Sequence, residues 1–499
     1  EAEATARKVL DIRRAALPPG HPFIAGALGD LAWAVNANGK FEEAQALQVE
    51  ALLMKQKLLG DSHPDIAFAL NSLGKVLGRL GDQPASEAVL RAVLSIQRKI
   101  LGEESEGTFE TIYSLARVLH TQGKRAEAET VWRELLSLWH KQGGDENPQR
   151  LYALRGLGET LEEEGKWPQA EAVWRESLSL WRRRGGIEEQ QSMYTLRKLG
   201  LALEAERKWL EAEAVHREAL AVSQKRGDTN PEALMDCERV ARVLLAEGKF
   251  AEAEKLLGGV LTPDFASRPA SINLLVARVN LNARQGRWPE AVTNVELLLK
   301  LEPSEHYHYH RLAALLAISH RVPAYQQLCK KIVATYTNIT NPYVDERLGQ
   351  GCLLLPESGV DLRVVDKFAD LAVTLGKNES ESALTYFRGC KAMSCYRLGN
   401  FGEAIAWAEL AAKSPVAEAQ SRAKALAILA LANWRLGKKD AARAALAQGD
   451  ALAPAYSPAN DLGESWVAWI IARVSLDEAA ALMKSEAANT KGLNSQSRQ

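Results

Sequence analysis

The sequence has little of what marks a secreted, membrane or disulfide-bonded protein. Its 499 residues contain only five cysteines, which form no CxxC pair: Cys237, Cys329, Cys352, Cys390 and Cys395. An odd, scattered set argues against a disulfide framework and for a reducing compartment, so we predict a cytoplasmic location. No apolar run approaches the roughly 18 residues of a membrane span, and no signal peptide is evident, so no membrane partner is predicted.

An excess of charge of one sign is also missing, as are catalytic motifs. Lys and Arg number 62 and Asp and Glu 63, a net charge of −1, so no global field predicts binding to nucleic acid. The kinase motifs GxGxxG, HRD and DFG are absent, and Asp264-Phe265-Ala266 does not replace the last of them. The P-loop, HExxH and GxSxG are absent too. We therefore predict that this chain by itself is not an enzyme and has no catalytic residues, cofactor or metal.

What the chain does contain is a repeat of 42 residues. Gly123-Lys124 recurs as Gly165-Lys166, and 165 − 123 = 42. Trp132 and Trp139 recur at the same offset as Trp174 and Trp181. The phase continues in both directions at Gly39, Gly81, Arg207, Gly248 and Gly286. A fixed period of this length is typical of a stacked repeat protein.

Each period predicts two helices joined at the glycine. Leu154, Leu157 and Leu161 form the apolar stripe of a first helix, and Gly165 supplies the left-handed turn that ends it. Small residues then allow the two helices to approach closely. They lie five after the turn (Ala44, Ser86, Ala128, Ala170, Ala212, Ala253, Ala291) and seven before it (Ala32, Gly74, Ala116, Gly158, Gly200, Ala241).

This pattern resembles the tetratricopeptide repeat, and the long period is similar to the kinesin light chain variety. That variety has a His-Pro pair before the first helix, which here is His21-Pro22 and His63-Pro64, again 63 − 21 = 42 residues apart. The resemblance covers residues 1–258, although later repeats keep only Pro148 or Pro231. It implies an all-α fold, a right-handed α-solenoid of about eleven helical hairpins.

A second resemblance covers about the last 230 residues, to the C-terminal region of certain bacterial Ser/Thr protein kinases of planctomycetes and their relatives. It rests on LEPSEHYHYHRLAALL from Leu301, on CLLLPESGVDL from Cys352, and on the segment Phe387–Ile405. Isolated residues between these segments also carry it: Tyr325, Cys329, Asn341-Pro342 and Glu346-Arg347. In such kinases a catalytic domain precedes a tetratricopeptide array, so the resemblance implies an upstream kinase domain acting in cis.

Three parts are predicted along the chain. Residues 1–258 hold the 42-residue repeats and start in mid-repeat, because Glu1-Ala2 aligns with Glu43-Ala44 at the start of a second helix. We expect a longer natural protein, the alternative being a capping helix. Residues 259–483 hold shorter, divergent hairpins and a closing helix, with a linker or kinked turn at 259–271. The polar residues 484–499 are expected to be disordered.

Two aromatic or histidine clusters have both a functional and a packing interpretation. His306, His308 and His310 suggest a metal site, but residues two apart on a helix do not share a face, so a solvated helix start is favoured. The four repeated tryptophans suggest either an aromatic ligand surface or packing between hairpins. Packing is favoured, more strongly for Trp132 and Trp174 than for Trp139 and Trp181.

The concave groove is the better candidate for a binding site. The resemblance implies that first helices line it, with inward residues about ten, six and two or three before the turn. These positions give the predicted peptide-binding set: Asn71, Lys75, Arg79, Tyr113, Arg117, Tyr152, Arg155, Tyr194, Arg197 and Arg242. One cation in each of five repeats, with tyrosines between them, indicates an extended acidic peptide with a large apolar side chain. A mixed, solvated helix face is the alternative.

The function predicted is therefore a non-enzymatic scaffold that holds a partner protein or peptide. A regulatory or substrate-docking arm of a larger Ser/Thr kinase is one alternative, with the groove holding the protein's own linker. A cytoskeletal adaptor like kinesin light chain is another, and it rests on repeat resemblance alone.

Overall fold

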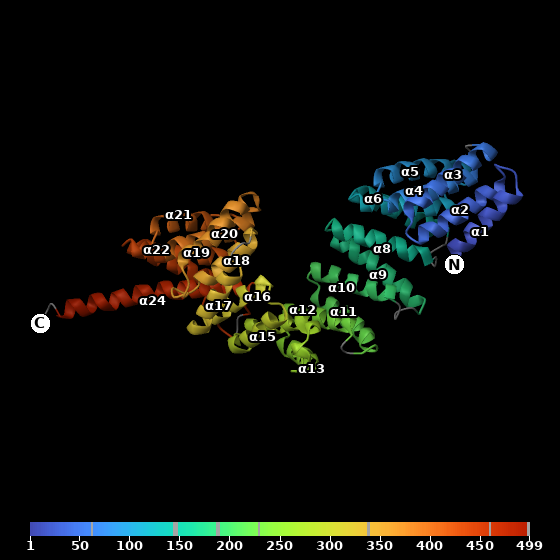
Figure 1. Ribbon diagram of the computed structural model, residues 1–499. Helices are drawn as coiled ribbons and strands as arrows, with labels where there is room; N and C mark the ends of the chain where they lie inside the picture. The colour runs from blue at the N-terminus through green and yellow to red at the C-terminus, as the bar shows by residue number, and fades with distance from the viewer. Residues whose placement is uncertain are drawn as a thin grey trace. The chain divides into compact units, whose positions relative to one another are not determined.

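The computed structural model describes residues 1–60, 63–142, 148–185, 190–227, 230–336, 340–458 and 461–496. Within these ranges the secondary structure is α-helical, with three short 3-10 turns and no strand (Figure 1). The chain divides into two compact units, residues 1–222 (unit 1) and 223–499 (unit 2). No described helix is both long and apolar enough to cross a bilayer.

Unit 1 is a single helix followed by antiparallel hairpins. Its helices are α1 (Ala2–Ala16), α2 (Pro22–Ala37), α3 (Phe41–Leu59), α4 (Pro64–Arg79), α5 (Gln83–Ile100), α6 (Glu106–Thr121), α7 (Arg125–Lys141), α8 (Pro148–Glu163), α9 (Trp167–Arg183), α10 (Gln190–Ala205) and most of α11 (Trp209–Gln224). The predicted His-Pro starts are N-terminal caps, because His21 and His63 each accept a backbone N–H two residues on through Nδ1.

Unit 2 continues the hairpins and ends in one long helix. Its helices are α12 (Pro231–Ala246), α13 (Phe250–Val260), α14 (Ile272–Arg284), α15 (Trp288–Leu301), α16 (His306–Ile318), α17 (Val322–Thr335), α18 (Pro342–Leu353), α19 (Leu362–Leu375), α20 (Glu381–Arg397), α21 (Phe401–Ala412), α22 (Ala419–Arg435), α23 (Lys439–Leu452) and α24 (Trp466–Gln496). In the described residues, helices α2 to α23 pair as eleven hairpins, (23 − 1)/2, which is the predicted number.

The hairpin turns have the predicted left-handed backbone. Gly123 and Gly165 have φ of 74° and 71°, a region that glycine enters without a steric penalty. Arg207 replaces the glycine and still adopts φ 58°, and His320 does the same at φ 53°. The repeat geometry therefore imposes the turn even where the side chain opposes it.

Small residues lie between the two helices of seven hairpins as predicted, whereas Tyr325 takes this position after the His320 turn. Ala170 is fully buried, and so are its counterparts in the other repeats: Ala44, Ser86, Ala128, Ala212, Ala253 and Ala291. On the facing helix, a methyl group placed on Gly158 would lie 2.5 Å from the Trp174 ring, well inside van der Waals contact. The glycine therefore makes room for the tryptophan.

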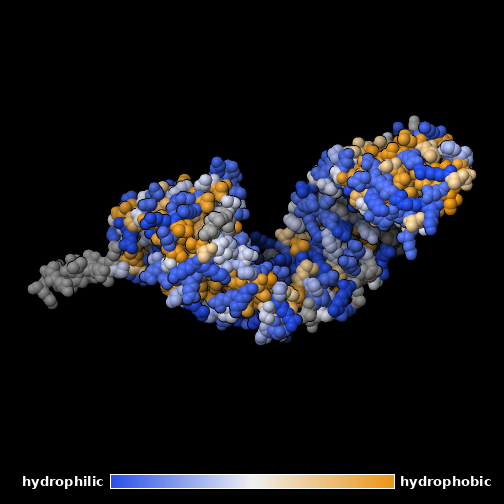
Figure 2. Space-filling model, viewed as in Figure 1, coloured by the Kyte–Doolittle hydropathy of each residue, from blue (hydrophilic) through white to orange (hydrophobic). Residues whose placement is uncertain are grey.

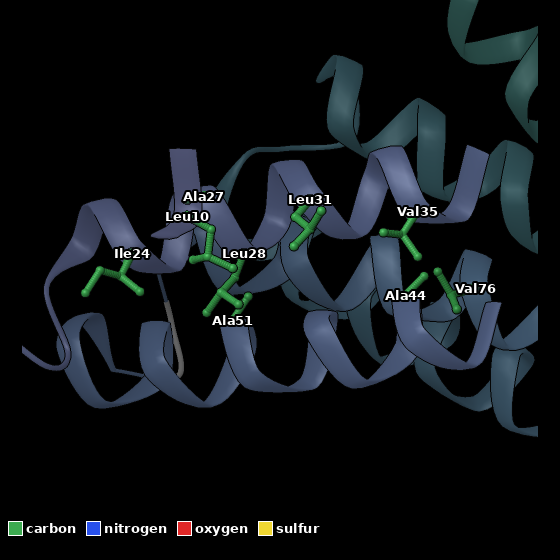
Figure 3. Packing of buried hydrophobic residues seen from close by; sticks show 9 residues of the cluster. All are labelled: Leu10, Ile24, Ala27, Leu28, Leu31, Val35, Ala44, Ala51 and Val76. Carbon is green, nitrogen blue, oxygen red and sulfur yellow. The ribbon is translucent and has the colours of Figure 1, made fainter. Parts of the chain in front are cut away.

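Helix α1 occupies the position of a second helix. Leu10 of α1 packs into a core with Ile24, Leu28 and other residues of α2, α3 and α4 (Figure 3). Arg7 pairs with Glu43, which lies 36 residues on (43 − 7), and two later second helices repeat this interval (Arg91–Glu127 and Arg175–Glu211). The alignment of Glu1 with Glu43 thus corresponds to a structural equivalence.

The three predicted parts of the chain stay a prediction, and two structural boundaries can be compared with them. The compact units meet between Val222 and Ser223, whereas the repeat period changes near residue 258. The change of period does not interrupt packing, because α14 contacts both α12 and α13 across the predicted linker, which forms two 3-10 turns. Residues 484–496, expected to be disordered, continue α24 to Gln496, and 497–499 lie outside the described residues.

Candidate functional site

A cavity of about 460 Å³ lies between the first helices of three hairpins in unit 1. Its walls come from α4, α6 and α8, with Gln83 and Leu90 of α5. The structure brings five of the predicted groove residues onto this wall: Lys75, Arg79, Tyr113, Arg117 and Tyr152. Glu110, Gln149 and Thr121 complete much of its polar lining.

Two of these cations are already engaged within the groove. Lys75 forms an ion pair with Glu110 on the next first helix, and Asn71 Nδ2 lies 3.5 Å from the same carboxylate. Arg79 donates to the side-chain oxygen of Asn36 at 3.1 Å. The predicted basic stripe is therefore partly neutralised by its own neighbours.

Arg117 differs from Lys75, which is paired with Glu110, and from Arg79, which donates to the Asn36 side-chain oxygen. It is exposed, and in the part of the chain that the structure describes it has no carboxylate partner. Its guanidinium lies 5.9 Å from the Tyr113 ring, which packs edge-on against Trp132 at 5.3 Å. Burial raises the pKa of Tyr113, so the phenol stays protonated. Tyr152 stands beside them, 50% exposed.

Arg155 and Tyr194 fill the next part of the groove themselves. The Arg155 guanidinium stacks 4.2 Å from the Tyr194 ring centroid and donates to Glu159 at 2.8 Å. The Tyr194 hydroxyl donates to the same carboxylate at 2.6 Å. Burial opposes ionisation of Glu159, yet these two donors hold its pKa below the ordinary value. A space of only about 10 Å³ remains beside them, roughly enough for one water.

The last two predicted cations lie elsewhere. Arg197 is half-buried on α10. Arg242 belongs to unit 2, where it lies 3.8 Å from Glu238 and lines a second cavity. The single five-member stripe expected from the sequence is therefore divided between two separate units.

The tryptophans pack between helices, as favoured. Trp132, Trp139 and Trp174 are buried. The Trp139 ring lies edge-on to Phe109 at 5.7 Å, and the indole N–H of Trp174 donates to Glu162 at 2.8 Å. Trp181 is half-buried and lines the small space beside Arg155.

Each of the three histidines of α16 has a hydrogen-bonding partner, and for two of them that partner is Arg347. His308 is buried with Nε2 3.0 Å from Glu302, and His306 Nε2 lies 3.0 Å from the Arg347 guanidinium. His310 Nδ1 contacts the backbone oxygen of Arg347 at 3.1 Å. Burial lowers the pKa of His310 to about 4, so its ring is neutral near pH 7.

Sequence reasoning missed two exposed aromatic residues at groove positions of unit 1. Trp33 is 68% exposed and lies six residues before Gly39, the position that Lys75 and Arg117 occupy in later repeats. Phe68 is 59% exposed and lies thirteen before Gly81 (81 − 68), the register of Tyr152. Apolar surface is visible over the α1–α5 end of unit 1 in Figure 2. Reading the groove positions in the first repeat would have found Trp33.

The position thirteen residues before a turn also contributes to the wall of a cavity of about 690 Å³ in unit 2. Tyr307, Tyr386 and Lys424 on its wall each lie thirteen before a turn residue of positive φ (His320, Gly399 and Gly437). The first helices α12, α14, α16, α18, α20 and α22 all contribute, and α24 forms part of the wall. The predicted groove set includes this position at Tyr152, but the prediction did not apply it to the divergent repeats after residue 258.

Comparison with known proteins supports the tetratricopeptide repeat predicted from the sequence. A family model described as tetratricopeptide repeat matches residues 34–99 and 107–183. No protein in the curated collection matches the chain. Residues 34–99 and 107–183 are thus tetratricopeptide repeats, and the predicted fold class, an all-α right-handed solenoid of tetratricopeptide hairpins, is confirmed.

Several solved structures are similar to parts of the chain. A Podospora anserina kinesin light chain with nearly identical TPR-like repeats is 21% identical over 42% of this chain and 98% of its own, with a TM-score of 0.38. BtubC (BKLC) from P. vanneervenii is 21% identical over 45% and 91%, with a TM-score of 0.40. A tetratricopeptide repeat protein from Parabacteroides merdae is 16% identical over 58% and 97%, with a TM-score of 0.35.

Proposed function

We propose that the chain is a protein-interaction scaffold and that the unit 1 cavity binds an extended acidic peptide carrying a large apolar side chain. The observation that supports this most directly is Arg117, an exposed groove cation with no carboxylate partner in the described structure, beside Tyr113 and Tyr152. Tetratricopeptide repeats typically bind proteins, and no catalytic step is proposed for this chain.

The ion pairs that already exist in the groove restrict which acidic peptides can bind there. Lys75 and Arg155 already have carboxylate partners in Glu110 and Glu159, so a ligand would have to displace an acid to reach either cation. Arg117 requires no such displacement, and its planar fork suits a single carboxylate. We therefore expect one essential acidic residue rather than a long acidic run.

The apolar part of the peptide is assigned to the N-terminal side of the cavity. Trp33 lies six residues before its turn glycine and Phe68 lies thirteen before its own. Residues at these positions line the groove in other repeats, and both aromatic side chains are mostly exposed. A large exposed aromatic is an effective anchor, because it buries much surface at little cost in conformational entropy. We expect the ligand's apolar side chain to contact this end while its acidic residue reaches Arg117.

Peptide binding by the full chain tests the proposal. A peptide library read by fluorescence polarisation should return acidic sequences with an aromatic or aliphatic anchor, and binding should weaken as salt screens the charge. Arg117→Glu should weaken the best ligand at least tenfold, about 1.4 kcal/mol, with unchanged helix content. Arg133→Glu, on second helix α7, is the matched control. Neutral or basic ligands, or full affinity in Arg117→Glu, would contradict the proposal.

The finer alternatives rest on resemblance alone. A regulatory or docking arm of a Ser/Thr kinase predicts that a longer natural chain binds added peptide less well, because its own linker would compete for the groove. A cytoskeletal adaptor predicts a motor or filament partner in pull-down experiments. None of the contacts described above favours either, so the general scaffold is the function proposed.

A further inference from the structure

The concave side of unit 2 is bounded by its own C-terminal helix. Helix α24 contacts the first helices α14, α16 and α22 and also the second helix α23; α16, α22 and α24 are labelled in Figure 1. Arg284 of α14 pairs with Asp461 just before α24, with Nε 2.8 Å from Oδ1. The indole N–H of Trp466 donates to Asn280 at 3.1 Å. The remaining space is a cavity of about 690 Å³, within the size range of small-molecule sites.

Three cations on its wall lack an acidic partner. In the described structure neither Arg311, Arg347 nor Lys424 has a carboxylate within 4.0 Å. Lys424 is only 4% exposed, and its ammonium donates to the amide oxygen of Gln350 at 2.9 Å. Burying a charge without a counter-ion is costly. A ligand that supplies negative charge would remove that cost.

The carboxylates of the same cavity do not neutralise these cations. Glu238 faces Arg242, and Glu418 accepts from the Tyr386 hydroxyl at 3.0 Å. Glu464 is exposed at the start of α24. Glu346 is buried, and burial raises the pKa of its carboxyl group, while the nearby charges of Lys424 and Arg347 act in the opposite direction. In the described residues, Arg311, Arg347 and Lys424 therefore have no direct ion pair with a carboxylate of this wall.

The cavity also carries a hydroxyl and aromatic walls. Ser421, one helical turn before Lys424 on α22, is buried, and its Oγ has no hydrogen bond of good geometry, although Tyr386 is close to it. The Arg347 guanidinium lies 4.0 Å from the Tyr307 ring centroid and 5.9 Å from that of Tyr343. A ligand would thus meet cationic donors, ring faces and the buried Ser421 hydroxyl next to Tyr386.

We propose that this cavity binds a small organic anion with an aromatic or unsaturated body. Its carboxylate or phosphate group contacts Lys424 and Ser421, and its body packs against the tyrosines beside Arg347. This ligand is distinct from the peptide of unit 1, and its site depends on residues of unit 2 only.

Thermal shift and calorimetry on the full chain test the site, with sodium phosphate, phenyl phosphate and sodium benzoate as probes at constant ionic strength. Phenyl phosphate or benzoate should raise the melting temperature and bind at least tenfold more tightly than inorganic phosphate. If only phenyl phosphate or only benzoate binds, the result identifies the anionic group of the ligand as a phosphate or a carboxylate. Equal affinity for all three probes, or no binding beyond that of sodium chloride, would overturn the proposal.

Lys424→Met provides the sharpest variant. Without ligand it should melt at a higher temperature, because an unpaired buried charge is removed, and it should lose at least tenfold in affinity for the probe. Lys413→Met is the control, since Lys413 is exposed and pairs with Glu409. A lower melting temperature without ligand, together with unchanged probe affinity, would show that Lys424 only supports Gln350. If Lys424→Met does not fold, Arg347→Met must show the same loss of affinity.

Discussion

Replacing Trp174 by alanine tests whether the repeats behave as a nearest-neighbour array. The Trp174 side chain is 0% exposed, packs on Gly158, and faces Tyr194 edge-on with ring centroids 6.2 Å apart. Removing a core aromatic of this kind costs about 3–5 kcal/mol. Part of this is the indole N–H bond to the Glu162 carboxylate, since such bonds contribute about 1.5–3 kcal/mol.

The loss should stay local, because each repeat contacts only its neighbours. Hydrogen exchange measured by mass spectrometry should show amides of α8, α9 and α10 exchanging roughly 100-fold faster, which corresponds to about 3 kcal/mol. Helices α20 to α23 should keep their protection. Trp181→Ala, on the same helix but half-buried, should have a smaller effect. Uniform loosening of both units, or a change under tenfold in α8 and α9, would refute the array interpretation.

Three further predictions concern single sites. Trp132→Phe should cost less stability than Trp174→Phe in denaturant unfolding, because the buried indole N–H of Trp132 has no partner to lose; equal losses would contradict this. Arg207→Gly should stabilise unit 1 by roughly 0.5–1 kcal/mol, since a side chain at φ 58° is strained, whereas Arg207→Ala should not. Burial raises the pKa of Asp345 to about 6 from 3.8. The folded state then binds more protons than the unfolded state between about pH 4 and 6, so stability falls as pH rises through that window. Asp345→Asn should remove the loss and gain roughly 1–2 kcal/mol at pH 7.5, but little at pH 4.5; a pH-independent difference would contradict the assignment.

The hairpins could be predicted because their causes lie within a few residues of one another. A turn glycine, a small residue five after it and an apolar stripe before it specify each hairpin locally, so Gly165 and Ala170 were assigned correctly. Even Arg207 follows the pattern, because the packing of its neighbours compensates for one strained turn. Repetition of the period extended these local rules along the chain.

The state of each groove residue was decided by the tertiary structure. The period shows that Lys75, Arg117 and Arg155 share a face, but not which acids stand opposite. Glu110 neutralises Lys75 from the next repeat, while Arg117 meets no such acid in the described residues. Which acid faces which cation depends on how far successive first helices are shifted relative to one another, and the repeat period does not specify that shift.

The unit 2 cavity depends on contacts that are still more distant in sequence. Arg284 and Asp461 are 177 residues apart, and Asn280 and Trp466 are 186 apart. A contact between residues so far apart leaves no pattern in the sequence around either of them, because neither residue determines which residue types are needed next to it. The sequence alone therefore determined that a closing helix would form. Only the tertiary structure decided that this helix packs on α14, α16, α22 and α23, at a cavity where three cations have no carboxylate partner in the described residues.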